Sequence, residues 1–367
     1  MGMQIIGGTL ARYFGWRFLG STVGIFVGIL ALSALIDYVE LMRRASDIPN
    51  ASPAVVAQIA LFRMPQLGER LMPFCVLIGT MSCYLNFSRR NELVVARAAG
   101  VSAWQFVAPA AFFAFLLGVL AVAAYNPISA LLQEQAKRLE GDVFGSRQAK
   151  LAVNTGTFWI AQRNDDGKAF INASSSRGQG VDLSGVTVFK FDKSGAYTER
   201  LEAQSAVLQS GSWHLTGVRA FPVGAPPQDR PSVDLPTNLT RAQVSENFAT
   251  PESVPFWELP QYIKTADHVG LAAAGYRLQF QKLLAKPFLL GAMVFLAAAV
   301  SLRFFRFGGV QKMVLSGILA GFLLYVLSKI TDDMTTAGLM HPITAAWLSV
   351  SVAAVVGVTA LLYQEDG

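Results

Sequence analysis

A polar insert lies between two groups of long apolar segments, and this arrangement limits the folds that the chain can adopt. Three uncharged runs precede the insert and three follow it. A membrane-spanning helix needs about 20 predominantly apolar residues. We therefore predict six spans, and the two shorter runs should take in flanking residues such as Leu283, Leu284 or Ile330. The uncharged runs are residues 18–36, 71–87, 101–133, 287–302, 313–328 and 343–363.

The insert, residues 126–262, has the pattern of a folded β domain. Short runs rich in β-branched and aromatic residues alternate with turn signals, as in an antiparallel sandwich or open barrel. We expect an antiparallel β domain there, between membrane regions formed by residues 1–125 and 263–367. Proline-rich residues 222–236 predict a long loop or an irregular edge. Residues 255–264 then predict a short amphipathic helix that returns the chain to the membrane.

One predicted strand of the insert has no polar face. Val186 and Val188 share one side of it, whereas Phe189 and Phe191 share the other. An interior that accommodates acyl chains would explain this pattern. An ordinary β core without a ligand explains it equally well.

Basic residues near the span ends predict the orientation, because cytoplasmic loops carry an excess of Lys and Arg. With the N-terminus inside, both termini are cytoplasmic and the insert is outside. The formal net charge of +6 follows partly from this bias and gives no reason to expect a nucleic-acid partner. The inner residues are Arg12, Arg17, Arg89, Arg90, Arg97, Arg303, Arg306 and Lys312, against Arg43, Arg44, Arg63 and Lys329 outside.

The sequence lacks the motifs of soluble catalysis. No G-x-x-x-x-G-K-[ST] phosphate loop is present, so the chain is not expected to hydrolyse ATP itself. His214, His268 and His341 have no ligand spacing, and we expect no metal or cofactor. Cys75 and Cys83 both fall in the second apolar run, where apolar packing is expected instead of a disulfide.

The loop between the second and third spans, residues 88–100, predicts a short cytoplasmic helix. A glycine stop follows it at Gly100, and Ser102 with Gln105 has capping-box spacing for the next helix. One reading is an interfacial helix whose arginines hold lipid headgroups. The other is a docking helix for a cytoplasmic partner, with a small apolar face and an acid at its edge. That face comprises Glu92, Leu93, Ala96 and Ala99.

Arg43 and Arg44 follow the first span on the outer side, against the usual charge bias. Glu40 can form a local ion pair worth about 0.2–0.5 kcal/mol, and we expect it to neutralise one arginine at a time. Guanidinium groups also bind phosphate bidentately. The alternative is therefore a clasp for a phosphorylated lipid, whose binding Asp37 and Glu40 would limit.

These segments resemble the LptF/LptG permeases of the bacterial lipopolysaccharide exporter, and the likeness extends over essentially the whole chain. The most specific element is the Arg-x-Glu-Leu-x-x-x-x-Ala-x-Gly pattern that begins at Arg90. The basic pair after the first span is more similar to the G-type subunit. Asp37 and Gln66 replace basic residues that some members carry. The segments that carry the resemblance are residues 38–44, 90–100, 257–264, 286–287 and 324–330.

The resemblance implies that the insert is a periplasmic, jellyroll-like antiparallel β domain. It also implies a subunit that exports lipopolysaccharide from the inner membrane and passes it to a periplasmic β-jellyroll bridge. Its expected partners are an LptF-like permease, a dimeric LptB-like ATPase, and LptA-like and LptC-like periplasmic proteins. It implies ATPase coupling through Glu92, Leu93, Ala96 and Arg97. It also supports substrate binding by Arg43, Arg44, Asp37 and Glu40.

Two other functions remain open from the sequence. A membrane-anchored scaffold whose β domain binds another protein would explain the insert, but not the arginine pair or the docking helix. An integral membrane enzyme would need a catalytic group, and Asp332 with Asp333 is the nearest paired acid. That pair is expected to cap a span end instead.

Overall fold

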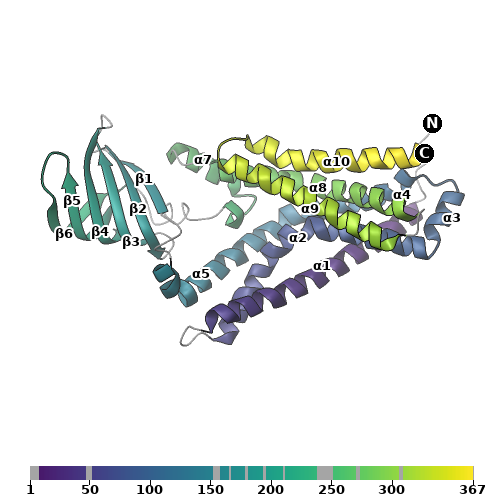
Figure 1. Cartoon of the computed structure of the whole chain (residues 1–367), viewed down its shortest axis with the longest axis horizontal. Coiled ribbons are helices and arrows are strands. Elements are labelled where there is room, and N and C mark those ends of the chain that lie inside the picture. Colours follow the sequence, from purple (N-terminus) through teal and green to yellow (C-terminus); the bar gives the residue numbers. More distant parts are fainter. Residues whose placement is uncertain are drawn as a thin grey trace.

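The computed structural model places the chain in an elongated arrangement of helices with a β-sheet at one end (Figure 1). It describes residues 8–46, 52–151, 158–164, 167–177, 181–192, 196–209, 211–237, 251–269, 273–305 and 309–366. The helices before the sheet are α1 (Gly8–Ala45), α2 (Pro53–Arg89), α3 (Glu92–Ala98), α4 (Ala103–Leu120), η1 (Ala121–Tyr125) and α5 (Asn126–Leu151). Those after it are η3 (Pro251–Ser253), α7 (Leu259–Val269), α8 (Ala274–Phe305), α9 (Val310–Thr336) and α10 (Pro342–Asp366).

Six helical segments are long and apolar enough to cross a membrane, which confirms the prediction. The fourth and fifth take in Leu283, Leu284 and Ile330, as expected. Helix α1 has 38 residues, so at 1.5 Å per residue it is about 57 Å long. A hydrocarbon core is only about 30 Å thick. Helix α1 is therefore longer than the apolar layer is thick, and Arg43 and Arg44 lie in its last turn, past the uncharged residues 18–36.

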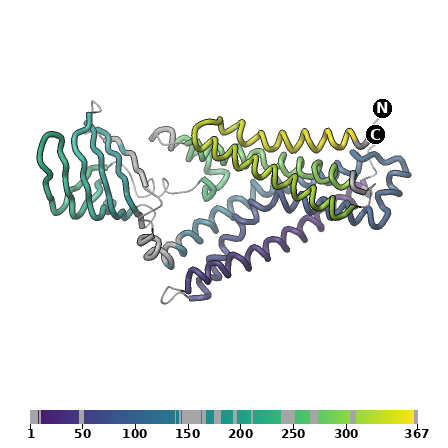
Figure 2. Tube along the Cα trace, viewed as in Figure 1, coloured from purple at the N-terminus to yellow at the C-terminus, as the bar shows by residue number. Residues whose placement is uncertain are grey.

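The sheet and the two chain termini lie at opposite ends of the molecule (Figure 1). Helix α3 lies at the end that holds the termini. Towards the sheet, α1, α2 and α5 lean away from α8, α9 and α10 (Figure 2). The two halves of the membrane region are thus packed together near the termini and diverge towards the β domain.

Glycines allow the packed helices to approach closely, as is common between membrane spans. A Cβ on Gly118 of α4 would lie 2.5 Å from Pro287 Cα of α8. A Cβ on Gly79 of α2 would lie 2.6 Å from Thr22 Cα of α1. The absence of a side chain at these positions is therefore what permits the α4–α8 and α1–α2 contacts.

The third span continues without interruption into the base of the β domain. Pro127 has no N–H, so it cannot bond the carbonyl four residues earlier, that of Ala123. The continuous helix formed by α4, η1 and α5 accommodates this proline with one π-helical turn, η1, in which the Asn126 N–H donates to the Ala121 carbonyl. The Trp257 Nε1–H donates to the freed Ala123 carbonyl at 3.3 Å. The π-helical turn before Pro127 thus offers a hydrogen-bond acceptor to Trp257, which lies more than a hundred residues later in the chain.

The insert contains a six-stranded antiparallel sheet whose strands are adjacent in chain order. This confirms the predicted antiparallel β domain between the third and fourth spans. Its strands are β1 (Phe158–Asn164), β2 (Gly167–Arg177), β3 (Asp182–Phe191), β4 (Tyr197–Gln209), β5 (Ser212–Pro222) and β6 (Gln228–Pro236).

One face of the sheet forms the core of this domain. Val186 and Val188 are buried on that face with Leu201 and Trp213, as strand alternation requires. The proline-rich segment forms β6, an edge strand paired only with β5 among the described strands. The sequence left a long loop or an irregular edge as alternatives, and the structure has an edge strand. An edge strand tolerates proline because it does not need every backbone N–H for pairing.

Candidate functional site

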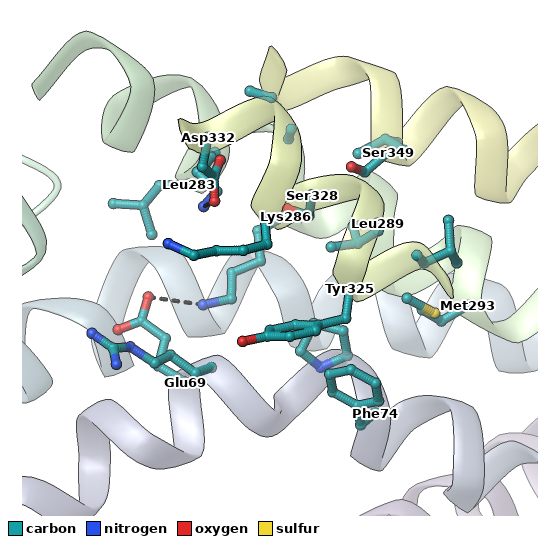
Figure 3. A pocket seen from close by; sticks show the side chains of 18 of the residues that line it. Glu69, Phe74, Leu283, Lys286, Leu289, Met293, Tyr325, Ser328, Asp332 and Ser349 are labelled. Atoms are coloured by element: carbon teal, nitrogen blue, oxygen red, sulfur yellow. Dashed lines mark hydrogen bonds and ion pairs between the residues drawn. The ribbon is translucent and has the colours of Figure 1, made fainter. Parts of the chain in front are cut away.

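A cavity of about 370 Å³ lies within the membrane region, towards its sheet end (Figure 3). Helices α2, α8, α9 and α10 line it, together with the short η3 turn. Its lining joins charged side chains with an apolar part. The charged members are Glu69, Arg70, Glu252, Lys282, Lys286, Lys329 and Asp332, and the apolar ones include Phe74, Leu283, Leu289, Met293, Leu324 and Tyr325.

Each basic group of the described lining has a carboxylate partner. Lys286 Nζ of α8 lies 2.8 Å from Glu69 Oε1 of α2, and Figure 3 shows this pair at the cavity wall. Lys282 Nζ lies 2.6 Å from Asp332 Oδ2 of α9. Arg70 pairs with Glu252 of η3, and Lys329 with Asp333 at 2.8 Å. An anionic occupant would therefore have to exchange with a carboxylate to gain a cation.

The Glu69–Lys286 pair is buried, with side chains 11% and 10% exposed. The Asn126 amide supports it by donating to both Glu69 oxygens, at 3.1 and 3.2 Å. Removing one member of a buried ion pair typically costs about 3–5 kcal/mol, whereas replacing both by apolar residues is often neutral. Ionisable groups inside spans are expensive and usually serve a function.

The opposite part of the cavity is apolar and aromatic. The rings of Phe74 and Tyr325 lie 6.1 Å apart and close one side. Ser349 of α10 also lines the cavity, and its hydroxyl is buried without a hydrogen-bond partner in the described structure. The cavity is thus suited to an amphipathic occupant with an anionic group and an apolar part.

The arginine pair of α1 does not line this cavity. Glu40 contacts both arginines at once, with Arg43 Nε at 2.9 Å from Oε2 and Arg44 Nε at 2.8 Å from Oε1. Arg43 Nη2 also donates to Oε1 at 2.9 Å, so that oxygen accepts from both guanidinium groups. Glu40 thus contacts both arginines but brings only one negative charge to them. The arginine side chains remain 75% and 63% exposed, so each can still meet a ligand.

Asp37 belongs to a separate cluster that joins three helices. Arg63 of α2 lies between Asp37 of α1, at 3.3 Å, and Glu140 of α5, at 3.4 Å. Burial raises the pKa of the Glu140 carboxyl above its usual value, and Arg63 opposes part of that shift. The geometry therefore gives Asp37 a structural partner, which distinguishes it from the exposed arginines.

The predicted cytoplasmic helix is present as α3, and the capping box of Ser102 with Gln105 is also observed. Leu93 is only 2% exposed and packs into the main core of the membrane region. It therefore anchors α3 from within and is not available to a partner. Val95, at 67% exposed, faces outward instead, and Tyr13 of α1 donates to Glu92 at 3.1 Å.

Ala96 and Arg97 also belong to the solvent-accessible part of α3, Arg97 being exposed and Ala96 half-buried. The sequence reading placed Leu93 on the docking face and missed Val95. A seven-residue helix is too short for periodicity to show which side faces the core.

Sequence reasoning also missed the Glu69–Lys286 pair. The uncharged runs used to predict the second and fourth spans begin at 71 and 287, just past these two charges, and the two residues were not considered as a pair. The helices extend further, so both side chains lie inside the spans. The useful signal was a single acid and a single lysine, each beside a long apolar run.

Asp332, Asp333 and His214 have ordinary partners, and the side chain of His268 lies outside the described residues. Asp332 and Asp333 each bind a different lysine, so they do not share a proton as a catalytic pair would. His214 Nδ1 lies 2.7 Å from Asp234 Oδ1 on the neighbouring strand. The described residues contain no group of three His, Cys, Asp or Glu that could hold a metal ion.

Six helices able to span a membrane, a cavity lined by charged and apolar side chains, and an inserted β domain define a multi-span membrane protein. The chain belongs to the lipopolysaccharide export system permease LptF/LptG family, whose profile matches residues 12–363. This confirms the resemblance found in the sequence. The lipopolysaccharide export system permease protein LptG of Escherichia coli K12 is 22% identical over 353 residues, covering 93% of this chain and 94% of that protein. LptG of Haemophilus influenzae is 23% identical over 344 residues, covering 88% of this chain and 89% of the relative.

Proposed function

We propose that this chain is the G-type permease subunit of an ATP-driven exporter that extracts lipopolysaccharide from the inner membrane. The observation that carries the proposal is the match to the permease family along nearly the whole chain. The LptG relatives support the G-type assignment. The proposed complex also contains an LptF-like permease, a dimeric LptB-like ATPase, and LptA-like and LptC-like proteins of the periplasmic bridge.

We place the termini and α3 in the cytoplasm and the β domain in the periplasm. The distribution of basic residues favours this orientation. In support, α3 lies at the same end as the termini, and the sheet lies at the other (Figure 1). Helix α3 would contact the ATPase through Glu92, Val95, Ala96 and Arg97, so that movement there reaches the membrane core through Leu93.

On the outer side, Arg43 and Arg44 would bind the phosphates of the lipid. Both are exposed, and their shared partner Glu40 leaves one net positive charge on the cluster. Lipid from this site would then pass to the β domain, whose buried apolar face could receive acyl chains. Asp37 would act indirectly by fixing α1 against α2 and α5.

The test is reconstitution of the chain in vesicles with the paralogous permease and the ATPase. We expect ATP-dependent transfer of a photo-crosslinkable lipopolysaccharide to the soluble bridge protein. A preparation lacking this chain, or supplied with a non-hydrolysable ATP analogue, is the control. If the chain recovers no ATPase subunit and transfer does not depend on it, the proposal fails and the scaffold function is favoured.

A further inference from the structure

A continuous set of polar contacts links the cavity to the segment that connects the β domain with α8. Lys286 donates to Glu69 at 2.8 Å, and Asn126 donates to the same carboxylate. The side-chain amide oxygen of Asn126, Oδ1, accepts from the Phe256 backbone N–H at 2.9 Å. Three of these residues come from three different helices, and the fourth belongs to the connector formed by residues 251–257.

The connector is held mainly by the first half of the membrane region. Glu252 pairs with Arg70 of α2, and Ser253 accepts from Lys137 of α5 at 3.4 Å. Trp257 donates to the Ala123 carbonyl that Pro127 leaves free. On the other side, the Phe256 ring stacks on Phe280 of α8, with centroids 5.4 Å apart and planes 7° apart. The connector thus lies where the two diverging halves of the membrane region meet.

Of the two least exposed ion pairs of the cavity, Glu69–Lys286 is better able than Lys282–Asp332 to exchange with an incoming anion. If Lys286 leaves, Glu69 still accepts two hydrogen bonds from Asn126. If Lys282 left Asp332 instead, that acid would lose its ion-pair partner, and its other oxygen is already buried without a hydrogen-bond partner among the described residues. Lys286 lines the cavity, so an anion that enters can reach its ammonium group.

We propose that Glu69 and Lys286 form an anion-sensitive clasp between the two halves of the membrane region, with Glu69 as its positioning residue. A phosphate group in the cavity takes Lys286 from Glu69, which uncouples α8 from α2. The connector stays with α2 and α5, so the β domain shifts relative to α8. This inference rests on the proposed function for the identity of the anionic lipid.

The test measures the distance between the β domain and the second half of the membrane region. Spin labels are placed at Gln209→Cys in β4 and Leu339→Cys after α9, both exposed positions. Cys75 and Cys83 are replaced by Ala. The complete exporter complex is reconstituted in phosphatidylcholine nanodiscs. It is measured alone, with lipopolysaccharide, and with dephosphorylated lipopolysaccharide. We expect lipopolysaccharide to shift the distance distribution and dephosphorylated lipopolysaccharide to leave it unchanged.

The decisive variant replaces both partners, Glu69→Met with Lys286→Met, because no unpaired charge then remains in the membrane. We expect it to assemble and to melt near the wild-type temperature. Its distance distribution should resemble that of the lipid-bound wild type and should not respond to lipid, and export should fall at least about ten-fold. Neutralising Lys329, whose pair lies within α9, should leave the distances of the lipid-free complex unchanged.

If the double variant exports lipid as the wild type does and its distance distribution responds to lipid in the same way, the clasp proposal is overturned. Glu69 and Lys286 would then form a purely structural ion pair. A wild-type distribution that ignores lipopolysaccharide while export continues would overturn it equally. Both outcomes leave the proposed function intact. That function fails separately if the wild-type complex does not export the lipid at all.

Discussion

The charged side chains of this chain fall into two kinds that differ in exposure. Lys286 and Glu69 in the membrane cavity are paired with each other and little exposed. Arg43 and Arg44 share one acid and remain largely exposed at the end of α1. Buried pairs hold helices together, whereas an exposed excess of charge is available for a ligand.

Reversing both arginines, Arg43→Glu with Arg44→Glu, should reduce lipopolysaccharide export by at least about ten-fold. The change would place three carboxylates together where the lipid phosphates are expected to bind. An exposed ion pair by itself contributes at most about 1 kcal/mol, so expression and complex assembly should remain normal. The measurement is ATP-driven transfer of crosslinkable lipid in vesicles.

Arg219→Glu in β5 is a matched control, because that arginine is also exposed and paired with a neighbouring acid. It should leave export unchanged. Full export by the double reversal would show that the arginines form a local helix-end pair and do not bind substrate.

At the scale of elements, the position of a helix in the membrane region depends in two places on a single residue. Helix α3 is fastened to the core by Leu93, and the Gly118–Pro287 contact sets the approach of α4 to α8. Each depends on one side chain or on the absence of one. Both are therefore sensitive to single substitutions.

In α3, Glu92→Ala and Val95→Asp should each weaken ATPase binding or uncouple hydrolysis from export. Truncating one member of a buried docking contact typically costs about 2–5 kcal/mol, and a charge at Val95 would oppose an apolar interface. Thermal stability of the chain should change little, because Val95 is exposed. Pulldown of the ATPase and its lipid-stimulated hydrolysis are the measurements.

Leu93→Ala is the contrasting variant. Because Leu93 is buried, it should destabilise the chain itself by about 2–5 kcal/mol. If Glu92→Ala and Val95→Asp both assembled and transported normally, α3 would not be the docking helix.

Gly118→Ala should separate α4 from α8 and destabilise the chain by about 1–3 kcal/mol, the usual cost of overpacking. Its Cβ would lie 2.5 Å from a backbone atom that cannot rotate away. Gly24→Ala is the control, since nothing lies within 4 Å of a Cβ there. Melting temperatures of the purified chain in detergent compare the two, and equal values would contradict the packing argument.

At the scale of the whole molecule, the β domain is held at the end of the membrane region where the two halves diverge (Figure 2). Helices α4, η1 and α5 precede the sheet, and the connector and α7 follow it in the chain before α8. Both connections meet at Asn126 and Ala123. A change in the angle between the halves is therefore expected to move the sheet.

Photo-crosslinkers at Val188 and Phe189 should distinguish the two faces of the sheet during transport. Val188 is fully buried in the β core, whereas Phe189 on the opposite face is half-buried. If acyl chains enter the domain, adducts with lipid should form at Val188 and not at Phe189, and only with ATP. Mass spectrometry of the crosslinked chain measures this. Absence of adducts at both positions during active turnover would contradict a lipid path through the domain.

The sequence by itself determined the six spans, the inserted antiparallel domain, the short helix after the second span and the family. These follow from local properties: the length of apolar runs, strand-forming composition, capping signals and a short motif. The tertiary structure decided which side of α3 is buried and that Glu40 binds both arginines. It also decided that Glu69, Asn126, Lys286 and the connector meet. Those facts depend on packing between helices distant in the chain, and no local pattern encodes which faces of two helices will touch.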